Sequence, residues 1–183
     1  MSTNHGLPPL AALIHPDDRH DIEALMESVA RRLQQSGRRV GGLVHRQSLY
    51  ANGNKCMRLV DLRSGRQFEM TEDLGASSKA CSLNPQALAQ ASVVLRQALA
   101  DGVELAMVNC FGQLEAAGGG FVQEIAGFVE AGIPVITAVA ARHEAGWLAF
   151  TGGDFVRLPV DEEALLQWCG QQLERTDARG LPC

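Results

Sequence analysis

Residues 103–115, VELAMVNCFGQLE, form an apolar run that becomes polar at Asn109 and ends on a carboxylate at Glu115. An apolar run bounded in this way is typical of a strand that is buried on both faces of a parallel sheet. Open α/β sheets bind their ligands just beyond the carboxyl ends of such strands. The segment therefore predicts an α/β fold and a ligand site at the tip of a strand over residues 105–108.

The composition suits one globular domain over residues 1–183, with 46% hydrophobic and 20% charged residues. The net charge of -5 gives no broad electrostatic basis for binding nucleic acid. No apolar run approaches the roughly 18 residues that a membrane span needs, and the N-terminus does not resemble a signal peptide. We therefore expect a cytoplasmic protein without membrane insertion, and a homo-oligomer stays open.

Strand-like and helix-like segments alternate along the chain. Strands are expected at 10–14, 40–45, 56–62, 66–70, 105–108, 133–139, 147–150 and 154–158. Helices are expected at 22–35, at 85–100, from the glycine-rich loop at 118–120 to about 131, and at 161–175. This alternation favours a mostly parallel sheet with helices on both faces. Turn signals at Asn52-Gly53 and Ser64-Gly65 indicate an antiparallel hairpin excursion at about 40–70.

The first strand-to-helix loop, HPDDRHD at 15–21, stands where a nucleotide-binding α/β protein carries a glycine-rich phosphate loop. Without glycine the backbone does not readily form a phosphate-cradling nest, and three aspartates without a lysine repel phosphate. Arg19, His20 and His15 are the residues that could still attract an anion here. The alternative is a solvated loop in which Asp21 caps the next helix.

Two segments place a lysine close to a cysteine. They contain Lys55 and Cys56, and Ser77, Ser78, Lys79 and Cys81. An ammonium group lowers a thiol pKa and so favours a nucleophile or soft-metal ligand, while serine and lysine together suit an oxoanion. The alternative is reduced cysteines near surface lysines, which we expect unless Cys56 and Cys81 converge. The five cysteines form no CxxC pair, so we expect no disulfide scaffold.

At the strand tip, Asn109 stands where an aspartate commonly holds magnesium in phosphoryl-transfer enzymes. An amide has no charge with which to hold a hard cation, so magnesium is not expected, and the histidines show no zinc-ligand spacing. The glycines at 118–120 could offer backbone N–H groups to an anion at a helix N-terminus, or form a flexible turn.

Five motifs resemble, in order, a bacterial family of unknown function that is related to the thermophilic nucleoside-triphosphatase family. They are GGLVHR (41–46), LVDLRSG (59–65), ACSLNP (80–85), VNCFGQLEAAGGG (108–120) and AGIPVITAV (131–139). The resemblance covers nearly the whole chain. It implies a three-layer P-loop NTPase-like domain, with a mostly parallel sheet and helices on both faces.

The active triphosphatases end their phosphate loop on Gly-Lys-Thr and carry Asp-Glu-Ile-Gly-Lys-Met-Glu at the tip of a later strand. Here Ile22 and Glu23 stand in the places of the lysine and threonine. At the second motif an Asn-Cys pair beginning at Asn109 replaces Asp-Glu, whereas Gly112 and Glu115 are kept. Phosphoryl transfer depends on the missing charged groups. The resemblance thus implies a degenerate Walker A loop and loss of ordinary Mg-ATP hydrolysis.

Members of that family are labelled as associated with molybdenum transport, which suggests an oxoanion ligand. The leading hypothesis is a non-catalytic protein that binds a small anion, either a molybdate-like oxoanion or a nucleotide phosphate, at the carboxyl ends of the parallel strands. A divergent nucleoside triphosphatase that uses Glu115 is one alternative, and a structural or regulatory partner in molybdenum metabolism is another. The expected ligand-binding residues are Arg19, His20, Arg46, Lys55, Cys56, Ser77, Ser78, Lys79, Cys81, Asn109, Phe111, Gly112 and Glu115.

Overall fold

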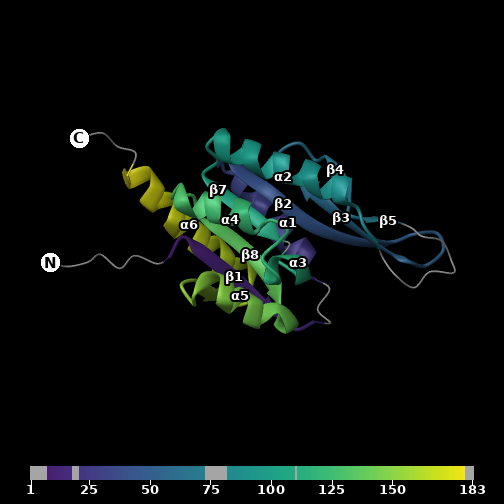
Figure 1. Ribbon diagram of the computed structural model, residues 1–183. Coiled ribbons are helices and arrows are strands. Elements are labelled where there is room, and N and C mark those ends of the chain that lie inside the picture. The colour runs from purple at the N-terminus through teal and green to yellow at the C-terminus, as the bar shows by residue number, and fades with distance from the viewer. Residues whose placement is uncertain (1–7, 18–20, 73–81, 110, 180–183) are drawn as a thin grey trace.

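The computed structural model describes residues 8–17, 21–72, 82–109 and 111–179. Its main feature is a seven-stranded sheet with the strand order β4-β3-β2-β7-β8-β1-β9, which lies between two layers of helices (Figure 1). A separate pair, β5-β6, completes the strands of the described part. The predicted α/β class and three-layer arrangement are confirmed.

The elements follow one another along the chain as the sequence pattern predicts, with few exceptions. The strands are β1 (Leu10–His15), β2 (Val40–Leu49), β3 (Lys55–Asp61), β4 (Gln67–Glu69), β5 (Thr71–Glu72), β6 (Ser82–Leu83), β7 (Leu105–Asn109), β8 (Val135–Ala140) and β9 (Val156–Leu158). The helices are α1 (Ile22–Gln35), α2 (Pro85–Ala100), α3 (Gln113–Ala116), α4 (Val122–Glu130), α5 (Glu144–Thr151) and α6 (Glu162–Arg179), with a short 3₁₀ turn η1 at Ala141–His143.

The sheet is parallel from β2 through β7, β8 and β1 to β9. At its other edge β3 runs antiparallel to β2, and β4 runs antiparallel to β3. These two edge strands are the hairpin excursion that the turn signals predict at about 40–70. They extend the sheet beyond its parallel part and, with β2, form the long arm seen in Figure 1.

The two faces of the sheet are covered by different helices. Along β7, Leu105 and Met107 belong to the core under α1 and α6, whereas Ala106 and Val108 belong to the core under α2, α4 and α5. Successive side chains of a strand point to opposite faces, so a continuous apolar run is needed where both faces are covered.

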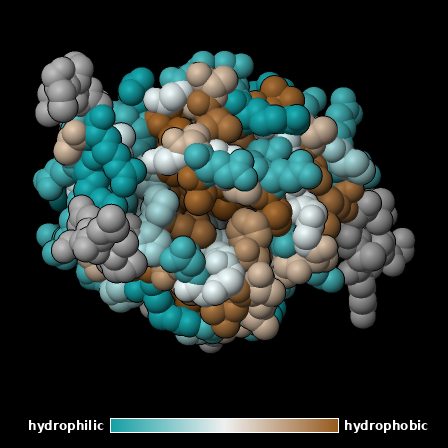
Figure 2. Space-filling model, turned by 60° about the vertical axis from the view of Figure 1, so that its left-hand side comes forward, coloured by the Kyte–Doolittle hydropathy of each residue, from teal (hydrophilic) through white to brown (hydrophobic). Residues whose placement is uncertain are grey.

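On the molecular surface, apolar side chains form a band across the side shown in Figure 2 and are bordered by hydrophilic residues.

The strand prediction is wrong for residues 147–150, which belong to α5. Trp147 is fully buried and packs edge-on against Phe111 and Phe155. A short apolar run fits a buried strand and a buried helix equally well, so its periodicity could not decide. The helix ends at Gly152, whose left-handed backbone (φ 63°) suits a helix C-terminus.

Strand β2 lies very close to β7 at Gly42. A Cβ atom at this position would lie 1.9 Å from the carbonyl oxygen of Met107, and the φ of Gly42 is +128°. Both the backbone angle and the contact therefore require glycine.

We predict that Gly42→Ala destabilises the protein by about 3 kcal/mol or more, because strain of the backbone adds to a clash with the neighbouring strand. Gly53→Ala is the matched control, since Gly53 also has a positive φ (+83°) but a Cβ atom there would have no neighbouring atom within 4 Å. Its cost should be nearer to about 1 kcal/mol. Urea unfolding would measure both, and equal losses would contradict the close-approach explanation.

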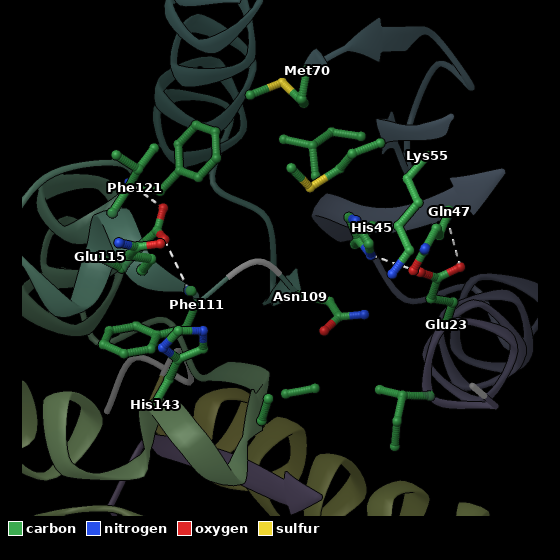
Figure 3. A pocket seen from close by; sticks show the side chains of 18 of the residues that line it. Glu23, His45, Gln47, Lys55, Met70, Asn109, Phe111, Glu115, Phe121 and His143 are labelled. Carbon is green, nitrogen blue, oxygen red and sulfur yellow. Dashed lines mark hydrogen bonds and ion pairs between the residues drawn. The ribbon is translucent and has the colours of Figure 1, made fainter. Parts of the chain in front are cut away.

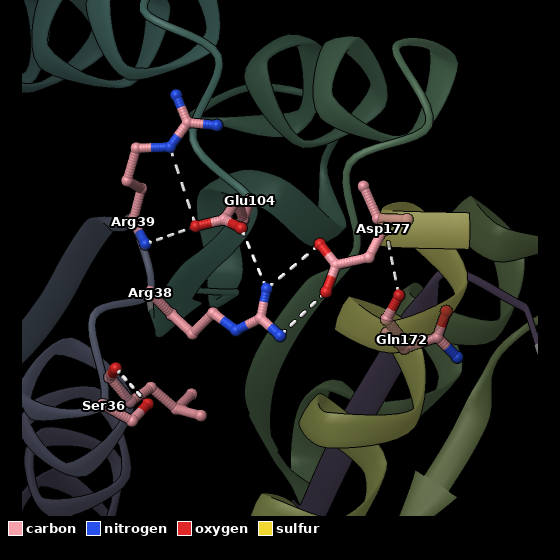
Figure 4. Close-up of polar contacts among 8 residues, drawn as sticks. Ser36, Arg38, Arg39, Glu104, Gln172 and Asp177 are labelled. Carbon is pink, nitrogen blue, oxygen red and sulfur yellow. Dashed lines mark hydrogen bonds and ion pairs between the residues drawn. The ribbon is translucent and has the colours of Figure 1, made fainter. Parts of the chain in front are cut away.

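An ion-pair network joins the amino ends of β2 and β7 to α6 (Figure 4). The Arg38 guanidinium donates to Glu104 Oε1 at 3.1 Å and to Asp177 Oδ2 at 2.9 Å, and the backbone N–H of Arg39 donates to Glu104 Oε2 at 2.7 Å. Burial by itself raises the pKa of Glu104. The hydrogen bonds from Arg39 and Arg38 outweigh this effect, so the pKa is lowered overall.

We predict that Glu104→Gln costs about 1–2 kcal/mol at pH 7, because it removes a charge-assisted acceptor. A carboxylate with a lowered folded-state pKa contributes stability above its unfolded pKa and loses that contribution as pH falls through the folded pKa. The difference between wild type and variant should therefore shrink in acid. Chemical unfolding at pH 7 and at about pH 3 would test this; a constant difference would contradict it.

Candidate functional site

A pocket of about 930 Å³ lies at the carboxyl ends of β1, β2, β7 and β8 (Figure 3). It is bounded by the hairpin arm on one side and by α3 and η1 on the other. One part of its wall is apolar and is formed by Met57, Leu59, Met70, Leu83, Leu88, Phe111 and Phe121. The polar part includes His15, Asp17, Glu23, His45, Gln47, Lys55, Asn109, Glu115, Arg142 and His143.

Asn109 is the last residue of β7 and lies in the middle of this pocket. It pairs in register with Val44 of β2 and is 6% exposed. Its amide makes no hydrogen bond to another residue of the described part, so it offers both a donor and an acceptor to a ligand.

Glu115 is buried and holds the chain that follows β7. Its Oε2 accepts a hydrogen bond from the backbone N–H of Gly112 at 2.9 Å, and its Oε1 accepts one from Phe121 at 3.1 Å. Gly120 lies so close that a Cβ atom there would be 1.9 Å from Glu115 Oε1. Both carboxylate oxygens thus already accept hydrogen bonds from the segment 112–121. These bonds position Phe121, which lines the pocket.

Phe111 connects the strand tip to that wall. It forms an isolated parallel bridge with Val139, and its ring contacts Trp147 edge-on with ring centroids 4.9 Å apart. A stacked contact with Phe150 at 5.9 Å completes an aromatic cluster. The ring is 4% exposed and lines the pocket from a fixed position.

The two neighbours Lys55 and Cys56 point to opposite faces of β3, as alternation along a strand requires. Lys55 extends toward the pocket (Figure 3). Cys56 is fully buried and is not one of the pocket-lining residues. Cys56 is thus a buried free cysteine outside the pocket lining, and a ligand-binding role for it, which the lysine–cysteine pattern suggested, stays a prediction.

Arg46 lies outside the pocket lining and is paired. Its Nη2 is 2.7 Å from Glu27 Oε1 across α1 and β2. The remaining predicted residues, Arg19, His20, Ser77, Ser78, Lys79 and Cys81, lie outside the described residues, so their relation to the pocket stays a prediction. Asp21 precedes α1, but its side chain does not cap the helix.

The sequence pattern missed a histidine–carboxylate pair in the pocket. His45 Nδ1 lies 2.6 Å from Glu23 Oε1, and Glu23 Oε2 accepts the backbone N–H of Gln47 at 2.9 Å. Burial raises the pKa of Glu23, but the hydrogen bonds from His45 and Gln47 lower it overall. No spacing in the sequence indicates this pair, because α1 and β2 meet only in the folded chain.

A second charged group lies across the pocket. Arg142 Nη1 is 3.3 Å from Asp17 Oδ1, and Arg142 Nε lies 3.2 Å from His143 Nε2. Burial and the neighbouring Arg142 lower the pKa of His143.

Within the described residues, no group of three or more histidine, cysteine or acidic side chains could hold a metal ion. The same part of the chain contains no helix that is long and apolar enough to cross a membrane.

We predict that Glu115→Gln destabilises the protein by about 1–3 kcal/mol, because a neutral amide cannot accept from both backbone N–H groups. Gln113→Ala, on the exposed side of α3, is the control and should change stability little. Urea unfolding of both variants would test the structural role of Glu115. A fully stable Glu115→Gln protein would show that the carboxylate is dispensable for the fold.

Comparison with known proteins agrees with this architecture. The chain is 37% identical over 161 residues to "Molybdenum import ATP-binding protein ModC 2" of Bradyrhizobium diazoefficiens, a match that covers 86% of this chain and 18% of that protein. The chain thus spans less than a fifth of that relative. The solution structure of a human cancer-related nucleoside triphosphatase matches with a TM-score of 0.61 and 14% identity, covering 92% of this chain and 97% of the other. At this identity the likeness concerns the fold alone.

Residues 10–168 match the model of a family described as "Protein of unknown function (DUF2478)". The match takes in every strand of the main sheet and the pocket. The protein therefore belongs to the DUF2478 family and has a P-loop NTPase-like fold.

Proposed function

We propose that the protein is a non-catalytic binding protein that takes a nucleotide-like anionic ligand in the pocket at the carboxyl ends of its parallel strands. The observation that carries this proposal is that one part of the pocket wall is apolar and another part is polar. Its volume of about 930 Å³ is within the range of sites for small organic molecules. A bare oxoanion would use only a small part of that space.

The apolar wall suits a nucleotide base. Met57 and Leu59 come from β3, while Phe111 and Phe121 come from the segment after β7. Burial of a flat ring against such side chains is favourable because apolar surface is removed from water on both partners. Molybdate has no apolar surface with which to gain from this wall, so the pocket favours the nucleotide over the oxoanion.

The polar side offers donors for phosphate oxygens. The Asn109 amide and the Lys55 ammonium enter the pocket from β7 and β3. The acidic groups near them are already engaged, since Glu23 pairs with His45, Asp17 with Arg142, and Glu115 with two backbone N–H groups. Their pairing weakens the repulsion that an anionic ligand would otherwise meet.

The non-catalytic part of the proposal rests on the groups that phosphoryl transfer needs. The segment 15–21 has neither glycine nor lysine, and Ile22 at the start of α1 is buried in the core. Asn109 is neutral, and both oxygens of Glu115 are occupied. Positioned charge supplies most of the rate enhancement in this chemistry, so binding without turnover is the expected result.

The short match to the long relative supports a second candidate. The matched portion is 18% of a protein named for ATP binding in molybdenum import. A unit of this size within a longer chain suits a structural or regulatory partner in molybdenum metabolism. In that case the pocket would bind no ligand, or its ligand would regulate a partner protein.

Isothermal titration with ATP, GTP, molybdate and tungstate would test the proposal. We expect binding heat with a nucleotide and no phosphate release on prolonged incubation. Asn109→Leu should weaken nucleotide binding by about tenfold, the effect of losing one good hydrogen bond. Gln171→Leu, which alters an exposed amide on α6 away from the pocket, is the control and should bind as the wild type does.

The absence of heat with both nucleotides at millimolar concentration would contradict the nucleotide proposal. Heat with molybdate or tungstate alone would replace it with the oxoanion alternative. Phosphate release that disappears in Glu115→Gln, in a variant shown to be folded, would instead support the divergent triphosphatase.

A further inference from the structure

Glu23 and His45 form a hydrogen-bonded pair in the wall of the pocket, which we call the dyad. Glu23 comes from the first turn of α1 and His45 from β2. Their side chains are about a quarter exposed, at 26% and 25%, and both line the pocket. Glu23 is held on its other oxygen by the backbone N–H of Gln47, so the carboxylate fixes the orientation of the imidazole ring.

The dyad also fixes which ring nitrogen carries the proton. The lowered pKa of Glu23 keeps its carboxylate ionised at neutral pH, and an ionised carboxylate only accepts hydrogen bonds. The contact of 2.6 Å therefore requires a proton on His45 Nδ1. In the neutral ring Nε2 is then an acceptor. It makes no hydrogen bond to another residue of the described part.

An acceptor in the wall of a pocket selects for a ligand that brings a donor. Molybdate and fully ionised phosphate oxygens only accept hydrogen bonds, so they gain nothing from a neutral Nε2. A sugar hydroxyl can donate to it. In a nucleotide the sugar lies between the base and the phosphates, and His45 correspondingly pairs in register with Leu59 of the apolar wall while Asn109 lies nearby (Figure 3).

The neighbouring helix–strand pair shows that this feature is local to the pocket. Glu27, one turn further along α1, pairs with Arg46, the residue after His45 on β2. That pair has a permanent cation and lies outside the pocket lining. Of these two contacts between α1 and β2, only the one that lines the pocket contains an imidazole, whose second ring nitrogen faces no partner within the contact and can accept a hydrogen bond from a ligand.

We propose that the Glu23–His45 dyad binds a ribose hydroxyl, with His45 Nε2 as the acceptor, and that the ligand class is therefore the ribonucleotides. This inference rests on the proposed function, since it assigns a part of the same pocket to a part of the nucleotide. It makes His45 a specificity-determining residue and Glu23 its positioning residue.

A series of ATP analogues tests the inference with the wild-type protein. Titrations at about pH 8 would compare ATP with its 2′-deoxy, 3′-deoxy and 2′,3′-dideoxy forms. We expect the dideoxy form and at least one of the monodeoxy forms to bind about tenfold more weakly, the effect of one lost hydrogen bond. Equal affinity for ATP and dideoxy-ATP would overturn the inference and leave the proposed function standing.

Glu23→Gln provides a second and independent readout. Its amide can donate to Nδ1 and so move the ring proton to Nε2, which turns the acceptor into a donor. The preference for ATP over dideoxy-ATP should therefore disappear in this variant. Glu27→Gln is the matched control, because it breaks the neighbouring α1–β2 pair outside the pocket, and it should keep the preference. Loss of the preference in both variants would indicate a general shift of α1 and overturn the role of the dyad.

The two proposals fail in different ways. If the wild-type protein binds neither ATP nor GTP, the proposed function itself is wrong, and the role of the dyad in nucleotide recognition falls with it. If it binds GTP alone, the same series of deoxy forms of GTP decides the inference. If the Glu23→Gln protein does not fold, the wild-type analogue series still decides the inference.

Discussion

The burial of β7 on both faces is the constraint on which the rest of the structure depends. Parallel neighbours, β2 and β8, satisfy its backbone, and helices cover it on either side. Its side chains must therefore be apolar until the strand leaves the sheet. Gly42 lets β2 approach closely at one point. The first polar side chain, Asn109, consequently appears at the carboxyl end, where the connections diverge and a pocket opens.

Two carboxylates at positions of the motifs that resemble the triphosphatases are engaged within the fold. Glu115 occupies the last position of the motif that resembles the triphosphatases, but its carboxylate serves two backbone N–H groups of the segment 112–121. Glu23 occupies the place of a threonine in the phosphate loop and pairs with His45 instead. In both cases a carboxylate satisfies groups of the protein itself. Under the proposed function, the pocket binds a nucleotide while these two carboxylates are engaged within the protein.

Much of the fold could be predicted because its elements have clear patterns. The helix at 22–35 shows apolar residues at helical spacing, and α2 begins with the Asn84-Pro85 signal, where the Asn84 side chain caps the helix. The run at 147–150 misleads because four apolar residues carry too little periodicity to separate a strand from a helix. For the site, the strand tip is evident from the sequence, but the burial of Cys56 and the pairing of Arg46 with Glu27 depend on neighbours that are distant in the chain.

By itself the sequence determined the α/β class, the hairpin excursion and the location of the pocket at the tip of β7, since these follow from apolar patterning and turn residues along a continuous segment. Only the tertiary structure decided which polar groups act together. The Glu23–His45 dyad joins α1 to β2. The hydrogen bonds of Glu115 and the apolar and polar parts of the pocket wall likewise bring together residues from different elements. Hydrogen bonds and charge pairs depend on distances of a few ångströms in space, and local sequence does not encode such distances between separate elements.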